Sequence, residues 1–289
     1  MDYTSVLHAF KHWMEVRGYK SNTIHMYGLI NQELLGYLTE HRNIQTWEAI
    51  VPGHIEQYYH EYLSTRPNQR RAGGLSERYL RHHVNGLALF FSYLELTGLL
   101  PYNLISGLTF PSVRMTERLI LSPAEVQSVF EHARNPLELS ILHLIYSCGL
   151  RRTEAIMLND TDLLWNERLL FVRCGKNHKQ RYVPLGRRVI ADLQQYQSQR
   201  QPLTGVDAFL LSSSGERMNG SVMNRIVQHL VGKAGIDKKV SLHTFRHSIA
   251  SHLVANGMNS ESVKELLGHS SLDTTMFYIH LNKRNYERI

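Results

Sequence analysis

A break in helical periodicity divides this chain of 289 residues into two parts. The interruption runs from Thr97 to Leu121 and contains two glycines and two prolines, Gly98, Pro101, Gly107 and Pro111. The next segment, Ser122-Pro123-Ala124-Glu125, has a serine at the N-cap, proline at the first helical position and glutamate three residues after the cap, which together predict a helix start. We therefore expect an N-terminal domain over 1–105, a linker over 106–120 and a second domain over 121–289.

The first part has apolar residues at helical spacing. The segments 3–17, 21–40 and 53–64 are predicted helices, separated by Gly18, a polar run and the Pro52-Gly53 pair. A fourth helix, over 78–96, has the clearest pattern. Its apolar residues recur every three or four positions at Leu80, Val84, Leu87, Phe91 and Leu94.

The second part starts with helical patterns over 122–133, 136–148 and 152–158 and then changes period. The runs 168–174 and 181–185 resemble strands, and the Gly-Lys-Asn-His-Lys-Gln segment between them is typical of a hairpin tip. The apolar run 208–213 is a possible third strand. Further helices are expected over 220–234, 242–256, 260–267 and 272–281. The predicted fold class is mainly α with a small antiparallel β-sheet.

The positive charge lies in the second part. Residues 1–110 contain nine basic and nine acidic residues, so the whole formal charge of +7 comes from the remainder. A basic field of this kind attracts polyanions, most commonly nucleic acid. No run approaches 18 apolar residues and the first 14 residues do not resemble a signal peptide, so we expect no membrane segment and a cytoplasmic location. The two cysteines, Cys148 and Cys174, do not suggest a disulfide framework or a cysteine zinc site.

Four short blocks in the second part carry residues suited to phosphodiester chemistry. They are Gly149-Leu150-Arg151-Arg152-Thr153-Glu154, Gly175-Lys176-Asn177-His178-Lys179, Leu242-His243-Thr244-Phe245-Arg246-His247, and Leu266-Leu267-Gly268-His269 followed by Tyr278. Arginines bind phosphoryl oxygens through a planar fork, lysine or histidine can protonate a leaving oxygen, and a phenol can hold the phosphate covalently. Each block alone has an ordinary structural explanation, such as a surface ion pair, a turn lysine or a packed tyrosine. Their joint order and spacing favour a catalytic set.

Together these blocks resemble the signature of the tyrosine recombinases, the phage-integrase and Xer-type family. The resemblance covers nearly the whole chain and implies an N-terminal helical core-binding (SAM-like) domain that clamps DNA together with the catalytic domain. It implies that Tyr278 is the nucleophile, that Arg151, Arg246 and His269 hold the scissile phosphate, that Lys176 protonates the leaving 5′-oxygen, and that His243 assists proton transfer. Glu154 would support the active-site helix. The expected partners are double-stranded DNA and three further copies, as a homo-tetramer on two DNA duplexes, without a metal or other cofactor.

Several alternatives stay open at this stage. Lys179 could replace Lys176 as the leaving-group acid, and His243 with His247 could form one face of a metal site. Other possible functions are a type IB topoisomerase-like DNA relaxer, a sequence-specific DNA-binding protein without catalysis, and a metal-dependent nuclease. Only 11 residues follow Tyr278, which puts subunit coupling through a C-terminal tail in doubt. The target site, and the choice between dimer resolution and mobile-element integration, cannot be read from the sequence.

Overall fold

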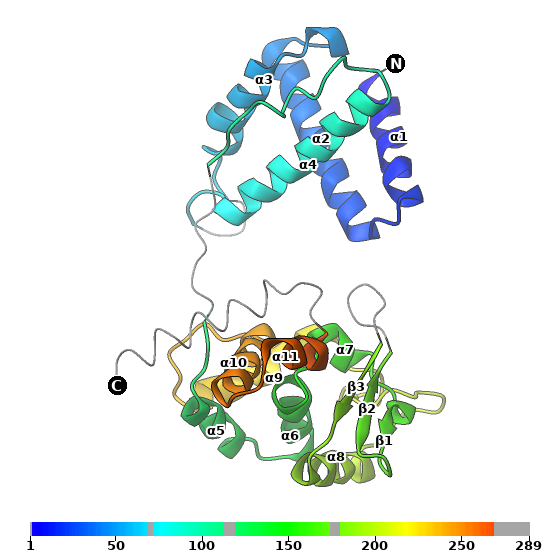
Figure 1. Ribbon diagram of the computed structural model, residues 1–289, viewed down its shortest axis with the longest axis vertical. Helices are drawn as coiled ribbons and strands as arrows, with labels where there is room; N and C mark the ends of the chain where they lie inside the picture. Colours follow the sequence, from blue (N-terminus) through cyan, green and yellow to red (C-terminus); the bar gives the residue numbers. More distant parts are fainter. Residues whose placement is uncertain (1, 69–71, 112–118, 174–179, 269–289) are drawn as a thin grey trace. The chain divides into compact units, whose positions relative to one another are not determined.

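The computed structural model describes residues 2–68, 72–111, 119–173 and 180–268 and contains two compact units, Met1–Thr116 and Glu117–Ile289 (Figure 1). Each unit has its own apolar core, and each is described by itself below.

The first unit is helical. It contains α1 (Tyr3–Val16), α2 (Ser21–Arg42), a short 3₁₀ turn (Trp47–Ala49), α3 (Pro52–Gln57) with a π-helical continuation (Tyr58–Leu63), and α4 (Glu77–Leu96). The four helical segments predicted from the sequence are confirmed. Helices α2 and α4 approach closely at Gly86, where a Cβ atom would lie 3.1 Å from the Tyr27 ring and 3.2 Å from Ile30. Asn31 donates to the Gly86 carbonyl at 3.4 Å across this contact.

The second unit opens with the predicted capping box. The Ser122 hydroxyl accepts from the Glu125 amide and the Glu125 carboxylate accepts from the Ser122 amide, which starts α5 (Pro123–Glu131). The elements that follow are α6 (Pro136–Leu142), a π-helical turn (His143–Ser147), α7 (Arg152–Ile156), a 3₁₀ turn (Asp160–Asp162), β1 (Leu163–Leu164), β2 (Leu169–Val172), β3 (Arg181–Pro184), α8 (Arg187–Gln199), α9 (Gly220–Lys233), α10 (Leu242–Ala255) and α11 (Ser260–Leu267).

The sheet is antiparallel in the order β1-β2-β3 over the described residues. Leu170 of β2 pairs with Val183 of β3, and both side chains are buried in the core of the unit. Strand β3 contacts α11, which also packs on α10 (Figure 1). The fold class predicted from the sequence, mainly α with a small antiparallel sheet, is confirmed.

Two details of the prediction were incomplete or wrong. The third strand is the pair Leu163–Leu164, not the apolar run 208–213. Residues 208–211 of that run are buried, but the run is irregular because its backbone bonds go to scattered partners: the Phe209 amide donates to the Leu158 carbonyl, and the Leu211 amide to the Tyr196 hydroxyl. Helix α8, whose buried Leu193 and Tyr196 lie three positions apart, was not predicted from the sequence. The predicted helix over 272–281 and the hairpin tip lie outside the described residues.

Candidate active site

A tight turn places Arg151 at the start of α7. Gly149, just before it, has a φ of +59°, and a Cβ atom there would lie 2.3 Å from the Leu267 side chain. Glycine is therefore needed both for the left-handed conformation and for the close approach of α11. Arg151 is the N-cap residue of α7, and its amide donates to the Glu154 carboxylate at 2.9 Å.

Glu154 is the centre of a cluster of three arginines. Its side chain is only 1% exposed. Arg151 Nη1 donates to Oε1 at 2.6 Å, and Arg181 donates to both carboxylate oxygens, at 3.1 and 2.8 Å. The third arginine, Arg246 on α10, has Nη1 3.7 Å from Oε2. Residues from α7, β3 and α10 thus meet at one buried carboxylate.

The predicted arginines also bind the backbone around the turn and the end of α11. Arg151 Nη2 donates to the Gly268 carbonyl at 2.6 Å. Arg246 donates to the carbonyls of Gly149 and Leu267 and is buried. The structure therefore brings together Arg151, Glu154 and Arg246. Glu154 lies 3 positions after Arg151 and 92 positions before Arg246 in the sequence. The same hydrogen-bond network orients the guanidinium groups of both arginines.

The charges in this cluster do not balance. Burial alone would raise the pKa of Glu154, but hydrogen bonds and attraction from Arg181, followed by Arg151, lower it to about 2. The carboxylate is therefore ionised at neutral pH, and one negative charge faces three guanidinium groups. The helix C-terminus of α11 supplies only a partial negative charge, equivalent to roughly half an elementary charge. Over the part of the chain that the structure describes, the cluster remains positive and suits an anionic ligand such as a phosphodiester.

His243 lies in the first turn of α10, one turn before Arg246 and His247. Burial lowers its pKa below the ordinary value of 6.5, and the positive charges of Arg152, Arg246 and Arg151 lower it further. The imidazole is therefore neutral near pH 7 and able to accept a proton. The residue is only partly buried, and the rest of it is exposed at the surface.

Three of the predicted site residues, Lys176, His269 and Tyr278, lie outside the described residues, as does Lys179. Within 2–68, 72–111, 119–173 and 180–268, the structure contains no group of three or more His, Cys, Asp or Glu side chains placed to hold a metal ion. Over the same residues, no helix combines the length and apolarity needed to cross a membrane.

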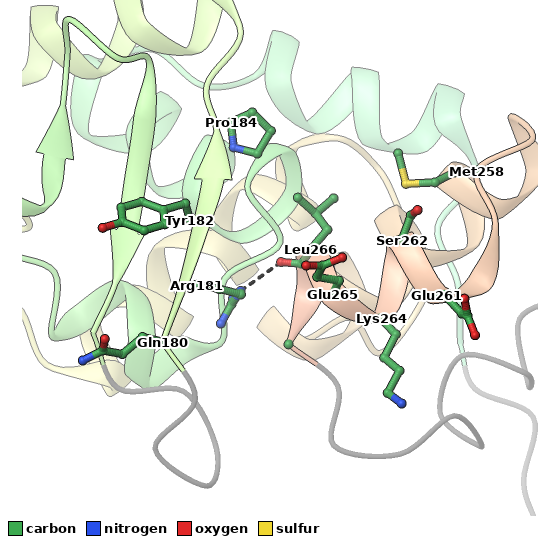
Figure 2. A pocket seen from close by; sticks show the side chains of 11 residues that line it. Gln180, Arg181, Tyr182, Pro184, Met258, Glu261, Ser262, Lys264, Glu265 and Leu266 are labelled. Carbon is green, nitrogen blue, oxygen red and sulfur yellow. Dashed lines mark hydrogen bonds between the residues drawn. The ribbon is translucent and has the colours of Figure 1, made fainter.

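Sequence reasoning missed Arg181. Its side chain leaves β3 toward α11 and donates through Nε to the Leu266 carbonyl at 2.9 Å (Figure 2). It forms part of the wall of an open groove of about 840 Å³ between these two elements. The one available signal was an arginine at the start of an apolar strand, which alone does not distinguish a buried ligand of Glu154 from a surface charge.

Comparison with known proteins identifies the family of this chain. Residues 120–285 match the model of the phage integrase family. A tyrosine recombinase of Pseudothermotoga lettingae is 31% identical over 271 residues, covering 93% of this chain and 90% of the relative. The tyrosine recombinase XerD of Oceanobacillus iheyensis is 31% identical over 291 residues, covering 95% and 93%.

Solved structures share the fold at lower sequence identity. The XerH site-specific recombinase in a post-cleavage complex with palindromic difH substrate matches with a TM-score of 0.76 and 21% identity, over 91% of this chain and 78% of that chain. A lambda integrase dimer bound to a COC′ core site matches with a TM-score of 0.72 and 16% identity, over 94% and 96%. The family model and the curated relatives, together with the fold, show that this chain belongs to the phage integrase family and is a Xer-like tyrosine recombinase.

Proposed function

We propose that this chain is a site-specific DNA recombinase that cleaves and rejoins DNA strands through a 3′-phosphotyrosyl intermediate. The observation that carries the proposal is the cluster of Arg151, Arg181 and Arg246 around the single carboxylate of Glu154, with distances between 2.6 and 3.7 Å. An enzyme that holds a phosphodiester by guanidinium groups needs such a surplus of fixed positive charge.

In the reaction, the phenol oxygen of Tyr278 attacks the scissile phosphorus, and the bond from phosphorus to the 5′-oxygen breaks. Lys176 protonates that 5′-oxygen, so the strand leaves as a 5′-hydroxyl and the phosphate stays on Tyr278 through its 3′ side. Arg151, Arg246 and His269 stabilise the charge on the non-bridging oxygens. His243, neutral for the reason given above, accepts the phenol proton or passes it on.

Rejoining reverses these steps with a different strand. The 5′-hydroxyl of a second strand attacks the phosphotyrosine, and Tyr278 leaves as the phenol. The covalent bond conserves the energy of the original phosphodiester, so exchange needs no nucleotide cofactor. We further propose that the domain over 1–105 clamps double-stranded DNA with the catalytic domain over 121–289, across a linker at 106–120. Four copies on two duplexes would exchange strands, an arrangement supported by the lambda integrase tetramer solved on a Holliday junction.

The test is to recover the DNA to which the protein becomes attached. Cells expressing the full chain are lysed in detergent, covalent protein–DNA complexes are isolated, and the attached DNA ends are sequenced. We expect one sequence family of ends, and no complexes from Tyr278→Phe. Complexes at scattered sequences would instead indicate a topoisomerase-like relaxer. Complexes that persist in Tyr278→Phe, or none from the unmodified chain, would refute the proposal.

A further inference from the structure

Three consecutive carbonyls at the end of α11 each accept a hydrogen bond from a different arginine. Arg181 Nε donates to Leu266 at 2.9 Å, Arg246 Nη2 donates to Leu267, and Arg151 Nη2 donates to Gly268 at 2.6 Å. The last carbonyls of a helix have no partners within the helix and carry partial negative charge. The three arginines satisfy these groups and fix the backbone at the end of α11 up to Gly268.

Arg181 differs from the other two arginines in how it is used. It makes a bidentate bond to Glu154 and reaches Leu266 at the same time, so the donors of its fork face protein groups. Its side chain is 8% exposed, compared with 18% for Arg151. Arg151 is thus the more accessible of the two to an incoming phosphate, whereas Arg181 links β3, α7 and α11.

We propose that Arg181 is a positioning residue for the strand-cleavage step: it holds Glu154 and the end of α11 so that Arg151 and Arg246 face the scissile phosphate correctly. This inference rests on the proposed function. Without Arg181, the Oε2 atom of Glu154 keeps the Arg151 amide at 2.9 Å but loses the hydrogen bond from Arg181 Nη2, and Arg246 Nη1 lies 3.7 Å away from it. Arg246 then moves toward Glu154 and away from Leu267. A displacement of about 1 Å in a group that stabilises the transition state costs roughly 100-fold in rate.

A lysine cannot replace this function in full. It has no planar fork, so one ammonium group cannot bind both carboxylate oxygens and the Leu266 carbonyl in the same geometry. It does keep the charge that compensates Glu154. Arg181→Lys therefore preserves the folded domain better than Arg181→Met does, yet still leaves the end of α11 less firmly held.

The chain offers a matched control for the loss of a buried arginine. Arg200 donates to the Asp160 carboxylate and to the carbonyls of Ala208 and Phe209, and its side chain is 6% exposed. It resembles Arg181 in burial and in the kinds of groups it binds, but it contacts neither Glu154 nor α11. Arg200→Met tests whether a general loss of stability explains a change in cleavage.

The experiment measures single-turnover cleavage by the full chain of a nicked duplex that carries the sequence recovered from covalent complexes. The rate of covalent complex formation at saturating DNA and the Kd for the same duplex are measured separately, at a temperature where each variant is folded. For Arg181→Met we expect about a 100-fold slower cleavage step. Its Kd stays within about threefold of the unmodified chain, because many phosphate contacts share the affinity. The cleavage rate of Arg181→Lys should lie between those of the unmodified chain and Arg181→Met. Arg200→Met should cleave at the unmodified rate.

Three results would overturn the inference: cleavage by folded Arg181→Met or Arg181→Lys at the unmodified rate, a loss of binding as large as the loss of cleavage, or an equal loss in Arg200→Met. If Arg181→Met does not fold, Arg181→Lys alone decides between these outcomes. Absence of covalent complex with the unmodified chain is a different result, since it would refute the proposed function itself and this inference with it.

Discussion

Replacing Glu154 by glutamine removes the carboxylate at which three arginines of the described residues meet. The substitution nearly preserves shape, so its main effect is electrostatic. The Glu154 side chain is 1% exposed and bonds Arg151 and Arg181 directly. Removing one partner of a buried ion pair destabilises a protein by about 3–5 kcal/mol, because the opposite charge is left without compensation. We expect a loss of this size at neutral pH.

The pH dependence of that loss is more diagnostic than its size. The arginines hold the pKa of Glu154 at about 2, below its ordinary value of 4.5. A lowered carboxyl pKa adds stability that is complete above the unfolded value and declines as pH falls toward the folded value. The shift corresponds to about 3 kcal/mol at neutral pH, of which roughly 1 kcal/mol is lost by pH 3.5.

Urea unfolding of the second unit can measure this difference. Trp165 packs against the core of that unit and, with Trp13 and Trp47 replaced by phenylalanine in both proteins, it becomes the only tryptophan. The gap in unfolding free energy between the parent and Glu154→Gln should shrink by about 1 kcal/mol between pH 6 and pH 3.5. A gap that stays constant over this range would refute the assignment of Glu154 as an ionised carboxylate held by arginines.

Two further predictions concern packing and a buried histidine. Gly149→Ala should destabilise the second unit by about 1–3 kcal/mol more than Gly257→Ala, because both glycines have positive φ but only at Gly149 would the Cβ meet Leu267. Equal losses in urea unfolding would show that the contact with α11 does not matter. In the first unit, His83 is buried and neither ring nitrogen bonds a described residue; burial, then the charges of Arg66 and His82, lowers its pKa to about 4. The free energy of unfolding should therefore fall by about 3 kcal/mol from pH 6.5 to pH 4, because the unfolded chain takes up the proton on His83 before the folded chain does. In denaturant titrations, His83→Leu should lose this part of the pH dependence. A pH slope in His83→Leu equal to that of the unmodified chain would contradict the prediction.

The sequence predicted the helices well because their signals are local. Ser122 and Glu125 form the expected capping box, and α4 follows the apolar spacing of its sequence. The strand assignment failed where tertiary contacts decide. The run 208–213 is apolar enough for a strand, but its backbone bonds reach Leu158 and Tyr196, whereas β1 has two residues and too short a pattern to detect.

The site shows the same division. Arg151 and Glu154 could be paired from their spacing, and Arg246 could be added through the resemblance. Arg181 could not, because it lies 27 positions from Glu154 and only the folding of β3 against α11 brings the two together. The group that Arg181 binds at Leu266 is a backbone carbonyl, and a backbone carbonyl is present at every position, so the sequence does not indicate this hydrogen bond.

The central claim is that Tyr278, one of 15 tyrosines in the chain, carries the DNA during strand exchange. Its direct test is mass spectrometry of the covalent complex after exhaustive nuclease and protease digestion. We expect one modified peptide, with a nucleotide remnant joined through its 3′-phosphate to Tyr278. A remnant on another tyrosine, on a serine or at a 5′-phosphate would contradict it.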